Sequence, residues 1–258
     1  MSKPKYFDIH SHLQSKKFKE DIDKVIFRLK ETNTDTIVVG TDLESSQEAV
    51  TLALKNEGIY ACIGVHPVDN PTKNFDKDLF EKLLDSNKVV AIGECGLDFY
   101  KVNKEEDYER QKKLFLDQVD FAVKKDLPLM IHARDAYLEI LDIISSLKPI
   151  HGEKLRGNVH FFAGNREIAQ KFFALNFSIS FTGVITFTND YDDVIKNSPI
   201  DMIMAETDSP YVSPAPYRGE RCEPAYVSLV YDRIAQIRGE DPEYIRSELV
   251  KNALRMVV

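Results

Sequence analysis

The chain has 258 residues and a formal net charge of −8, with 43% hydrophobic and 29% charged residues. This composition is ordinary for a soluble protein with a well-developed core, and we expect residues 1–258 to form a single α/β domain. The acidic balance argues against a broad electropositive surface that binds duplex nucleic acid nonspecifically. It still permits a polyanionic substrate held locally by metal ions and a few arginines.

The sequence predicts neither a signal peptide nor a membrane span. Its first residues lack the apolar run of a signal peptide, and no segment approaches the length and hydropathy of a membrane span. Cys62, Cys95 and Cys222 lie far apart and form no CxxC pair, which is typical of reduced thiols. We therefore expect a cytoplasmic protein that does not contact membranes, while the choice between monomer and weak oligomer stays open.

Strand-like and helix-like segments alternate along the chain. Short apolar runs predict strands over residues 6–12, 36–39, 59–65, 89–92, 128–131, 158–159, 177–181 and 202–205. Apolar residues at helical spacing predict helices over residues 16–31, 43–55, 76–84, 104–125, 136–147, 166–174, 225–237 and 242–256. Such an alternation indicates a parallel sheet covered by helices. With eight units, a closed (β/α)8 TIM barrel is the leading arrangement, and an open doubly wound sheet is second. The absence of a Gly-rich dinucleotide or phosphate loop after any strand favours the barrel.

Polar residues collect at the predicted strand ends, where the chemistry of such a barrel lies. Five of the six histidines fall there, and only His151 lies elsewhere. The residues at these ends are His10, His12, His66, Glu94, His132, His160 and Asp208. His10 and His12 are two apart on a strand and share a face, so together they could form a pair of metal ligands.

Each of these residues has an ordinary structural explanation when taken alone. His66 precedes a proline and suits a turn, whereas His132 or His160 could be a core histidine with its hydrogen bonds satisfied. Asp208 could cap the loop that follows it. Glu94 is harder to explain, because a buried carboxylate needs a partner to offset its desolvation. Together they offer too many ligands for one four-coordinate zinc ion, and they favour two metal ions bridged by a carboxylate.

With these residues in place, the chain resembles the TatD family of metal-dependent deoxyribonucleases, within the amidohydrolase-like barrel superfamily. The resemblance covers essentially the whole chain. The matching motifs are Phe7-Asp-Ile-His-Ser-His12, Ile63-Gly-Val-His-Pro67, Ala91-Ile-Gly-Glu-Cys-Gly-Leu-Asp98, Arg110-Gln111 with Phe115 and Gln118, Pro128-Leu-Met-Ile-His-Ala-Arg-Asp135, His160-Phe-Phe-Ala-Gly164, Glu206-Thr-Asp-Ser-Pro210 and Pro216-Tyr-Arg-Gly219.

The resemblance implies two divalent metal cations per subunit, Mg²⁺, Mn²⁺ or Zn²⁺, whose identity the sequence does not determine. The implied ligands are His10, His12 and Asp208 for one cation, His132 and His160 for the other, and Glu94 as the bridge between them. Relatives in the wider superfamily often use a carboxylated lysine as the bridge. Here the nearest lysine, Lys88, lies at the start of the fourth strand, which favours the nuclease branch over amidases and phosphotriesterase-like enzymes.

Three positions depart from the family pattern. Phe161 and Ala163 replace a thiol and a hydroxyl after the sixth strand, and Cys222 replaces an asparagine before Glu223. The chain end also lacks the usual Phe or Leu. None of these changes removes a ligand, but they leave substrate preference and helix packing open.

Two cations are expected to lower the pKa of a bridging water toward ~7, and the hydroxide that forms is expected to attack a phosphodiester in line. Asp208 is expected to orient it and accept its proton, so Asp208 and Glu94 are the predicted catalytic residues. His66, Arg134 and Arg218 are candidates for holding phosphate oxygens. For Arg134 the alternative is a surface salt bridge at a helix start. Asp8 is expected to orient a histidine ring and is not counted as a ligand.

A metal pair at the rim of an acidic protein favours single-stranded DNA and strand ends, which can reach into a pocket. We therefore expect a 3′–5′ exonuclease acting on single-stranded or frayed DNA ends, an expectation that rests partly on the family resemblance. Two rivals remain. One is a metal-dependent hydrolase of a small amide, lactone or phosphoester, and the other is a nonenzymatic barrel that keeps a structural metal and binds a partner.

Overall fold

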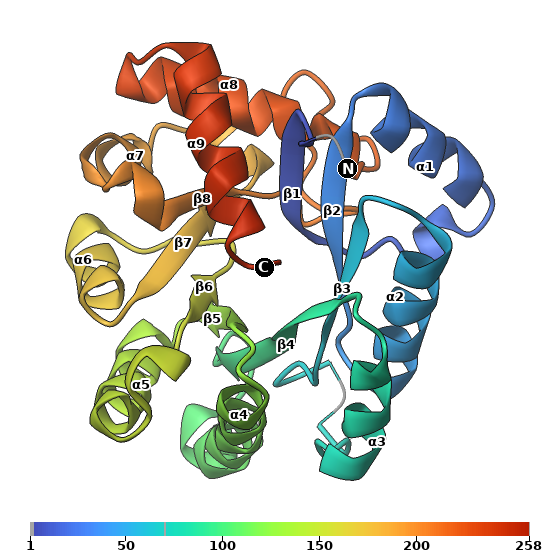
Figure 1. The fold of residues 1–258 in the computed structure, drawn as a ribbon. Helices are drawn as coiled ribbons and strands as arrows, with labels where there is room; N and C mark the ends of the chain where they lie inside the picture. Colours follow the sequence, from blue (N-terminus) through green and yellow to red (C-terminus); the bar gives the residue numbers. More distant parts are fainter. Residues whose placement is uncertain (1–2, 70, 258) are drawn as a thin grey trace.

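The protein folds into a barrel of eight parallel strands surrounded by helices (Figure 1). The computed structural model describes residues 3–69 and 71–257. Each strand pairs with the next in sequence, from β1 to β8. The strands are β1 Tyr6–Ser11, β2 Thr34–Val39, β3 Ile59–Ile63, β4 Val89–Asp98, β5 Leu129–Arg134, β6 Gly157–Val159, β7 Phe177–Phe181 and β8 Ile203–Ala205. The (β/α)8 barrel expected from the sequence is thereby confirmed.

The barrel closes through the residues that follow β8 rather than along β8 itself. The backbone N–H of Asp208 donates to the carbonyl of His10 at 2.9 Å, and that of His12 donates to the carbonyl of Ser209 at 2.7 Å. Ser11 and Ser209 form an isolated parallel bridge at the same place. The closure therefore fixes Asp208 beside His10 and His12, although almost 200 residues separate it from them in the chain.

Nine helices, counted over the described residues, lie outside the strands. They are α1 Ile22–Glu31, α2 Leu43–Lys55, α3 Lys77–Glu81, α4 Lys104–Lys125, α5 Tyr137–His151, α6 Arg166–Ala174, α7 Asp192–Asn197, α8 Val227–Arg238 and α9 Pro242–Leu254. Within the described part of the chain, none is both long enough and apolar enough to cross a membrane.

Two helix predictions differ from the structure. The helix expected over residues 16–31 is interrupted, because only Lys16–Phe18 forms a 3-10 turn before α1 begins at Ile22. Asp21 stays outside the helix, with its carboxylate held by the guanidinium of Arg221 at 2.6 and 2.7 Å. No helix was expected between β7 and β8, where α7 lies. Its six residues are too few to display a helical period.

Two irregularities in the sheet lie beside the predicted ligands. Asp8 pairs with Thr36 but Ser11 with Val38, so β1 holds one residue more than β2 around His10. In the same way, β4 holds one residue more than β5 between residues 92 and 95, around Glu94. An extra residue bends a strand and re-aims the side chains near it. Both His10 and Glu94 thus project from bulged stretches.

Steric constraints explain why glycines flank Glu94 at positions 93 and 96. A Cβ atom on Gly93 would lie 2.4 Å from the carbonyl oxygen of Met130, and one on Gly96 would lie 2.0 Å from that of His132. Gly93 has a φ of +155° and Gly96 one of +142°, which side chains rarely allow. Only glycine lets β4 approach β5 this closely, so the pair of glycines sets the path of the strand that carries Glu94.

A stability prediction concerns Asp35, near the amino-terminal end of β2. Burial raises the pKa of Asp35 to about 6, although Lys88 opposes the shift. The folded state therefore holds this proton more tightly than the unfolded state, and folding loses stability as pH rises from about 4 through about 6. We expect Asp35→Asn to raise the free energy of unfolding by about 1–2 kcal/mol at pH 7.5, discounted for partial exposure. Urea unfolding at pH 7.5 and pH 5 measures this gain, which must shrink at the lower pH; an equal gain at both would contradict the prediction.

Candidate metal centre

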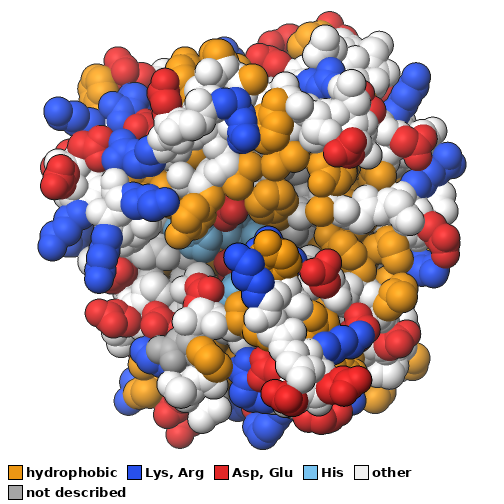
Figure 2. Space-filling view, turned by 180° about the vertical axis from the view of Figure 1, so that it is seen from behind, with side chains coloured by type: hydrophobic (Ala, Val, Ile, Leu, Met, Phe, Trp, Pro, Cys, Tyr) orange, Lys and Arg blue, Asp and Glu red, His pale blue; other side chains and the backbone are white. Residues whose placement is uncertain are grey.

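The carboxyl ends of the strands surround one pocket of about 1110 Å³. Figure 2 shows histidine and acidic side chains at the bottom of this hollow, with hydrophobic and some basic side chains at its rim. The predicted site residues that line the pocket are His12, His66, Glu94, His132, Arg134, His160 and Asp208. His10 is fully buried beneath them. Arg218 is not among the residues that line the pocket.

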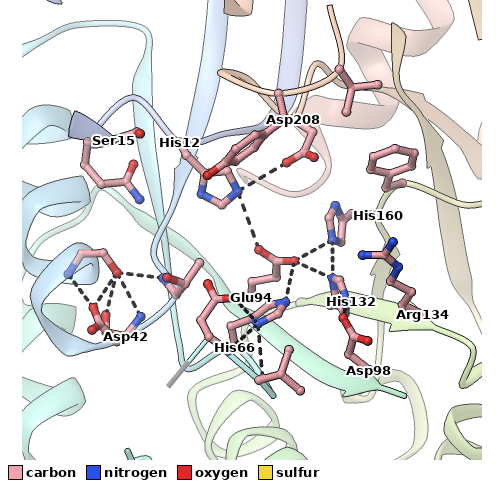
Figure 3. A pocket seen from close by; sticks show the side chains of 18 of the residues that line it. His12, Ser15, Asp42, His66, Glu94, Asp98, His132, Arg134, His160 and Asp208 are labelled. Carbon is pink, nitrogen blue, oxygen red and sulfur yellow. Dashed lines mark hydrogen bonds and ion pairs between the residues drawn. The ribbon is translucent and has the colours of Figure 1, made fainter. Parts of the chain in front are cut away.

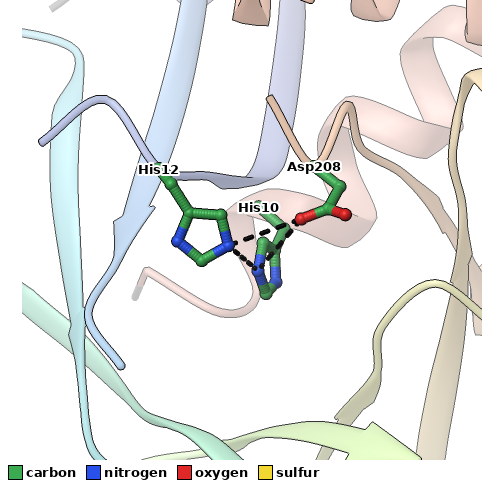
Figure 4. A group of neighbouring side chains, drawn as sticks. All are labelled: His10, His12 and Asp208. Atoms are coloured by element: carbon green, nitrogen blue, oxygen red, sulfur yellow. Dashed lines mark hydrogen bonds and ion pairs between the residues drawn. The ribbon is translucent and has the colours of Figure 1, made fainter. Parts of the chain in front are cut away.

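His10, His12 and Asp208 form the first cluster of donor atoms (Figure 4). The two Nε2 atoms are 3.2 Å apart, and Asp208 Oδ1 lies 3.4 Å from His12 Nε2 and 3.8 Å from His10 Nε2. Ligands of a tetrahedral zinc ion, at bonds of about 2.1 Å, are about 3.4 Å apart. The Nδ1 atom of His12 lies 2.8 Å from the carbonyl of Val39, which fixes the ring with Nε2 facing the cluster. These donor atoms therefore have the spacing to share one cation.

Glu94 lies between this cluster and a second one (Figure 3). Its Oε1 is 2.8 Å from His132 Nδ1 and 2.8 Å from His160 Nε2, and these two nitrogens are 3.3 Å apart. Its Oε2 is 3.5 Å from His10 Nε2 and 3.8 Å from His12 Nε2. One oxygen of the carboxylate thus faces each pair of histidines, which is the geometry that a bridging ligand requires.

The buried charges of the site stabilise one another. Burial alone raises the pKa of Glu94, but the charges of His160 and His66 and hydrogen bonds from His10 and His132 hold it well below its usual value. Burial alone lowers the pKa of His160, but the negative charge of Glu94 raises it well above the ordinary value. His160 and Glu94, whose carboxylate is 4% exposed, therefore stabilise the charged forms of each other. A cation can take over that role, so the donor set fits a metal.

Two carboxylates that the sequence reasoning did not assign support the second cluster. Asp98 Oδ2 lies 3.0 Å from His132 Nε2. Glu206 Oε1 lies 3.4 Å from His160 Nδ1, and its Oε2 accepts a hydrogen bond of 2.6 Å from the hydroxyl of Ser180. Such partners orient metal-binding imidazoles and raise their basicity. Both carboxylates could have been identified from the sequence, because side chains an even number of residues apart on a strand share a face. Asp98 lies four residues after Glu94, and Glu206 lies two residues before Asp208.

Asp8 has a different role from the one expected. Its Oδ1 accepts hydrogen bonds from the backbone N–H groups of Thr207 at 2.8 Å and His10 at 3.3 Å, and its Oδ2 accepts one from the Thr207 hydroxyl at 2.6 Å. None of these contacts involves a histidine ring. Asp8 therefore ties β1 to the segment after β8, and it positions His10 through the backbone.

The three predicted phosphate-binding residues differ in their contacts and in whether they line the pocket. His66 Nε2 lies 3.7 Å from Glu94 Oε1, and its Nδ1 lies 2.9 Å from Asp69 Oδ1. Arg134 is exposed, and its guanidinium lies 3.6 Å from the ring centre of Tyr100. The described residues give Arg134 no ion pair, so the alternative of a helix-start salt bridge is not seen. The guanidinium of Arg218 lies 3.6 Å from the ring centre of Phe187, outside the pocket lining.

The contact between Asp98 and His132 leads to a prediction on metal affinity. Asp98→Asn keeps the shape of the side chain but removes the negative charge that faces His132 Nε2. We expect the dissociation constant of the bound cation to rise about 10- to 100-fold. Calorimetric titration of metal-stripped protein measures the change, with Asp117→Asn on the surface of α4 as the matched control. Equal affinities in the two variants would show that Asp98 does not support the ligand.

The chain matches known proteins over almost its full length. Residues 7–257 match the family model described as TatD related DNase. A protein of Bacillus subtilis named "Uncharacterized metal-dependent hydrolase YabD" is 37% identical, over 97% of this chain and 98% of its own. One of Cronobacter sakazakii named "3'-5' ssDNA/RNA exonuclease TatD" is 32% identical, over 97% of each chain. The crystal structure of YjjV, a TatD homolog from Escherichia coli, superposes with a TM-score of 0.89 at 25% identity, covering 99% of this chain and 98% of its own.

Proposed function

This chain belongs to the family of TatD-related DNases, which are metal-dependent hydrolases, and we propose that it removes nucleotides from the 3′ ends of single-stranded or frayed DNA. The proposal rests on the position of Glu94, which directs one carboxylate oxygen toward each pair of histidines. The name of the Cronobacter relative supports the polarity and the preference for single strands, and it adds RNA as a possible substrate.

Two cations fit the donor atoms better than one. The two groups of histidines face opposite oxygens of the same carboxylate, which supports two cations rather than one. Divalent cations in such a site supply positive charge that polarises a phosphodiester and favours ionisation of water. Lys88 does not compete with Glu94 as the bridge, because its Nζ donates to the carbonyls of Asn56 and Ile59 at the other end of the barrel.

The remaining steps are assigned to side chains of the pocket. Asp208 lies at the pocket side of the first cluster, where its carboxylate can orient the attacking water and accept its proton. Arg134 presents a guanidinium without an ion-pair partner among the described residues, and it can grip phosphate oxygens with two parallel hydrogen bonds. His66 can donate a further hydrogen bond to the phosphate from beside Glu94. Arg218, the third candidate, is not among the residues that line the pocket.

The function is tested with 5′-labelled oligonucleotides and a panel of divalent cations. We expect single-stranded DNA to be shortened stepwise from the 3′ end, blunt duplex to be cut more slowly, and circular single strands to survive. A chelator should stop the reaction while circular dichroism shows the metal-stripped protein still folded, which rules out a purely structural metal.

Two outcomes would overturn the proposal. Cleavage of circular DNA would show endonuclease action. Hydrolysis of small amides, lactones or phosphoesters, with no activity on any oligonucleotide, would select the alternative class of hydrolase.

A further inference from the structure

Phe161, which follows His160 directly, has a backbone conformation that bulky residues rarely adopt. Its φ is +45°, in the left-handed region. Its N–H donates a hydrogen bond of 2.8 Å to Glu206 Oε1, and Glu206 is fully buried. The other oxygen of that carboxylate is held by Ser180. A buried carboxylate thus maintains the strained turn, and such strain is characteristic of functional positions.

This turn sends two neighbouring aromatic rings in different directions. Phe162 points into the core, where it is 2% exposed and its ring centre lies 5.3 Å from that of Tyr137 and 6.5 Å from that of Phe181. Phe161 lines the pocket instead and stays partly exposed. Its ring centre lies 6.5 Å from that of His160, at 74°, which leaves the faces of the ring without a stacked aromatic partner among the described residues. The protein therefore keeps a flat apolar surface in a pocket of charged groups.

The same pocket also offers a site for an anion. His160 Nε2 lies 2.8 Å from Glu94, so Phe161 is one residue away from the centre of the metal-binding cluster. Arg134, from the neighbouring strand β5, lines the pocket with its guanidinium 3.6 Å from the ring centre of Tyr100. An anion site joined to an exposed aromatic face matches the chemistry of a nucleotide, which carries a phosphate and a planar base.

We propose that Phe161 forms a stacking subsite for the nucleobase of the nucleotide whose phosphate lies at the metal centre. The inference rests on the proposed nuclease function and names how the substrate is held. Every base has a stacking face, so the subsite tolerates any sequence. A base within intact duplex has both faces covered by its neighbours, so the subsite favours frayed ends and single strands. Phe161 is thus a specificity-determining residue rather than part of the metal site.

The test uses a fluorescent nucleotide that needs no hydrolysis. The 5′-monophosphate of 2-aminopurine deoxyriboside loses fluorescence when its base stacks, so titration with the protein reports both binding and stacking. We expect Phe161→Leu, which keeps an apolar side chain but removes the aromatic face, to weaken binding about 5- to 150-fold and to abolish the quenching. Phe161→Trp should retain both. Phe27→Leu, at a ring of α1 that is 59% exposed, is the matched control and should change neither.

Deoxyribose 5-phosphate, which has no base, separates stacking from a general disturbance of the pocket. By calorimetry it should bind the Phe161→Leu variant as well as the unaltered protein. Quenching that survives Phe161→Leu, equal losses for the two ligands, or no binding of the fluorescent nucleotide would each overturn the inference. A different result would show that the proposed nuclease function is wrong, namely the absence of oligonucleotide hydrolysis with every cation in the panel.

Discussion

Glu94→Gln is expected to lower the rate of oligonucleotide hydrolysis by at least about 10³-fold. Glutamine has the shape of glutamate but lacks its charge, and only one of its two terminal atoms can bind a cation. The Oε1 and Oε2 atoms of Glu94 face different pairs of histidines, so the amide cannot serve both. We therefore expect the variant to hold at most one cation per chain.

The same substitution changes the protonation of the site without metal. Glu94 raises the pKa of His160, and its loss leaves that imidazole with Glu206 as its remaining negative partner and His132 with Asp98. Removing one member of a buried charged group destabilises a protein by about 3–5 kcal/mol unless the other members lose their charge. Here the histidines can release protons, so we expect the variant to remain folded.

The measurements are the metal content of the purified protein, its circular dichroism and the rate on a labelled oligonucleotide. Glu48→Gln is the matched control, because Glu48 lines the same pocket and is exposed. This control should keep both the metal and the rate. A Glu94→Gln protein that binds two cations, or keeps a tenth of the activity, would refute the bridging role.

The candidate ligand positions could be predicted because of how parallel barrels are built. Each strand ends at the same rim, so a polar residue after an apolar run marks the site without any knowledge of tertiary contacts. His132 and His160 follow this rule directly, since β6 ends at Val159 and β5 carries His132 near its end. The bulges around His10 and Glu94 could not be predicted, because they depend on the register between strands that are far apart in sequence.

The supporting residues were missed for a related reason. The fourth strand was expected to end at Ile92, whereas β4 continues to Asp98 with every residue buried. The glycines at positions 93 and 96 resemble a loop in sequence, but they serve the close approach of β5. A longer strand would have placed Asp98 on the face of Glu94. The direction of the Phe161 ring could likewise not be predicted from the sequence. It depends on a buried hydrogen bond with Glu206, which lies 45 residues further along the chain.

Asp208→Asn is expected to lower kcat about 10²- to 10⁴-fold, because an amide cannot accept a proton from water. Asp208 has a φ of 55°, a conformation that asparagine adopts readily, so the backbone contacts with His10 and Tyr211 should survive. The amide oxygen can still face His12 Nε2, so we expect one cation to bind more weakly while the second is retained.

The split between kcat and metal binding is what identifies Asp208 as the base. Saturating the Asp208→Asn protein with cation should restore the metal content but not kcat, whereas a residue that acts only as a ligand would recover its activity. Asp69→Asn is the matched control: Asp69 lines the same pocket, but its carboxylate lies 2.9 Å from His66 Nδ1 rather than at the first cluster. Full recovery of kcat by added cation would assign the proton transfer to another group and leave Asp208 as a ligand alone.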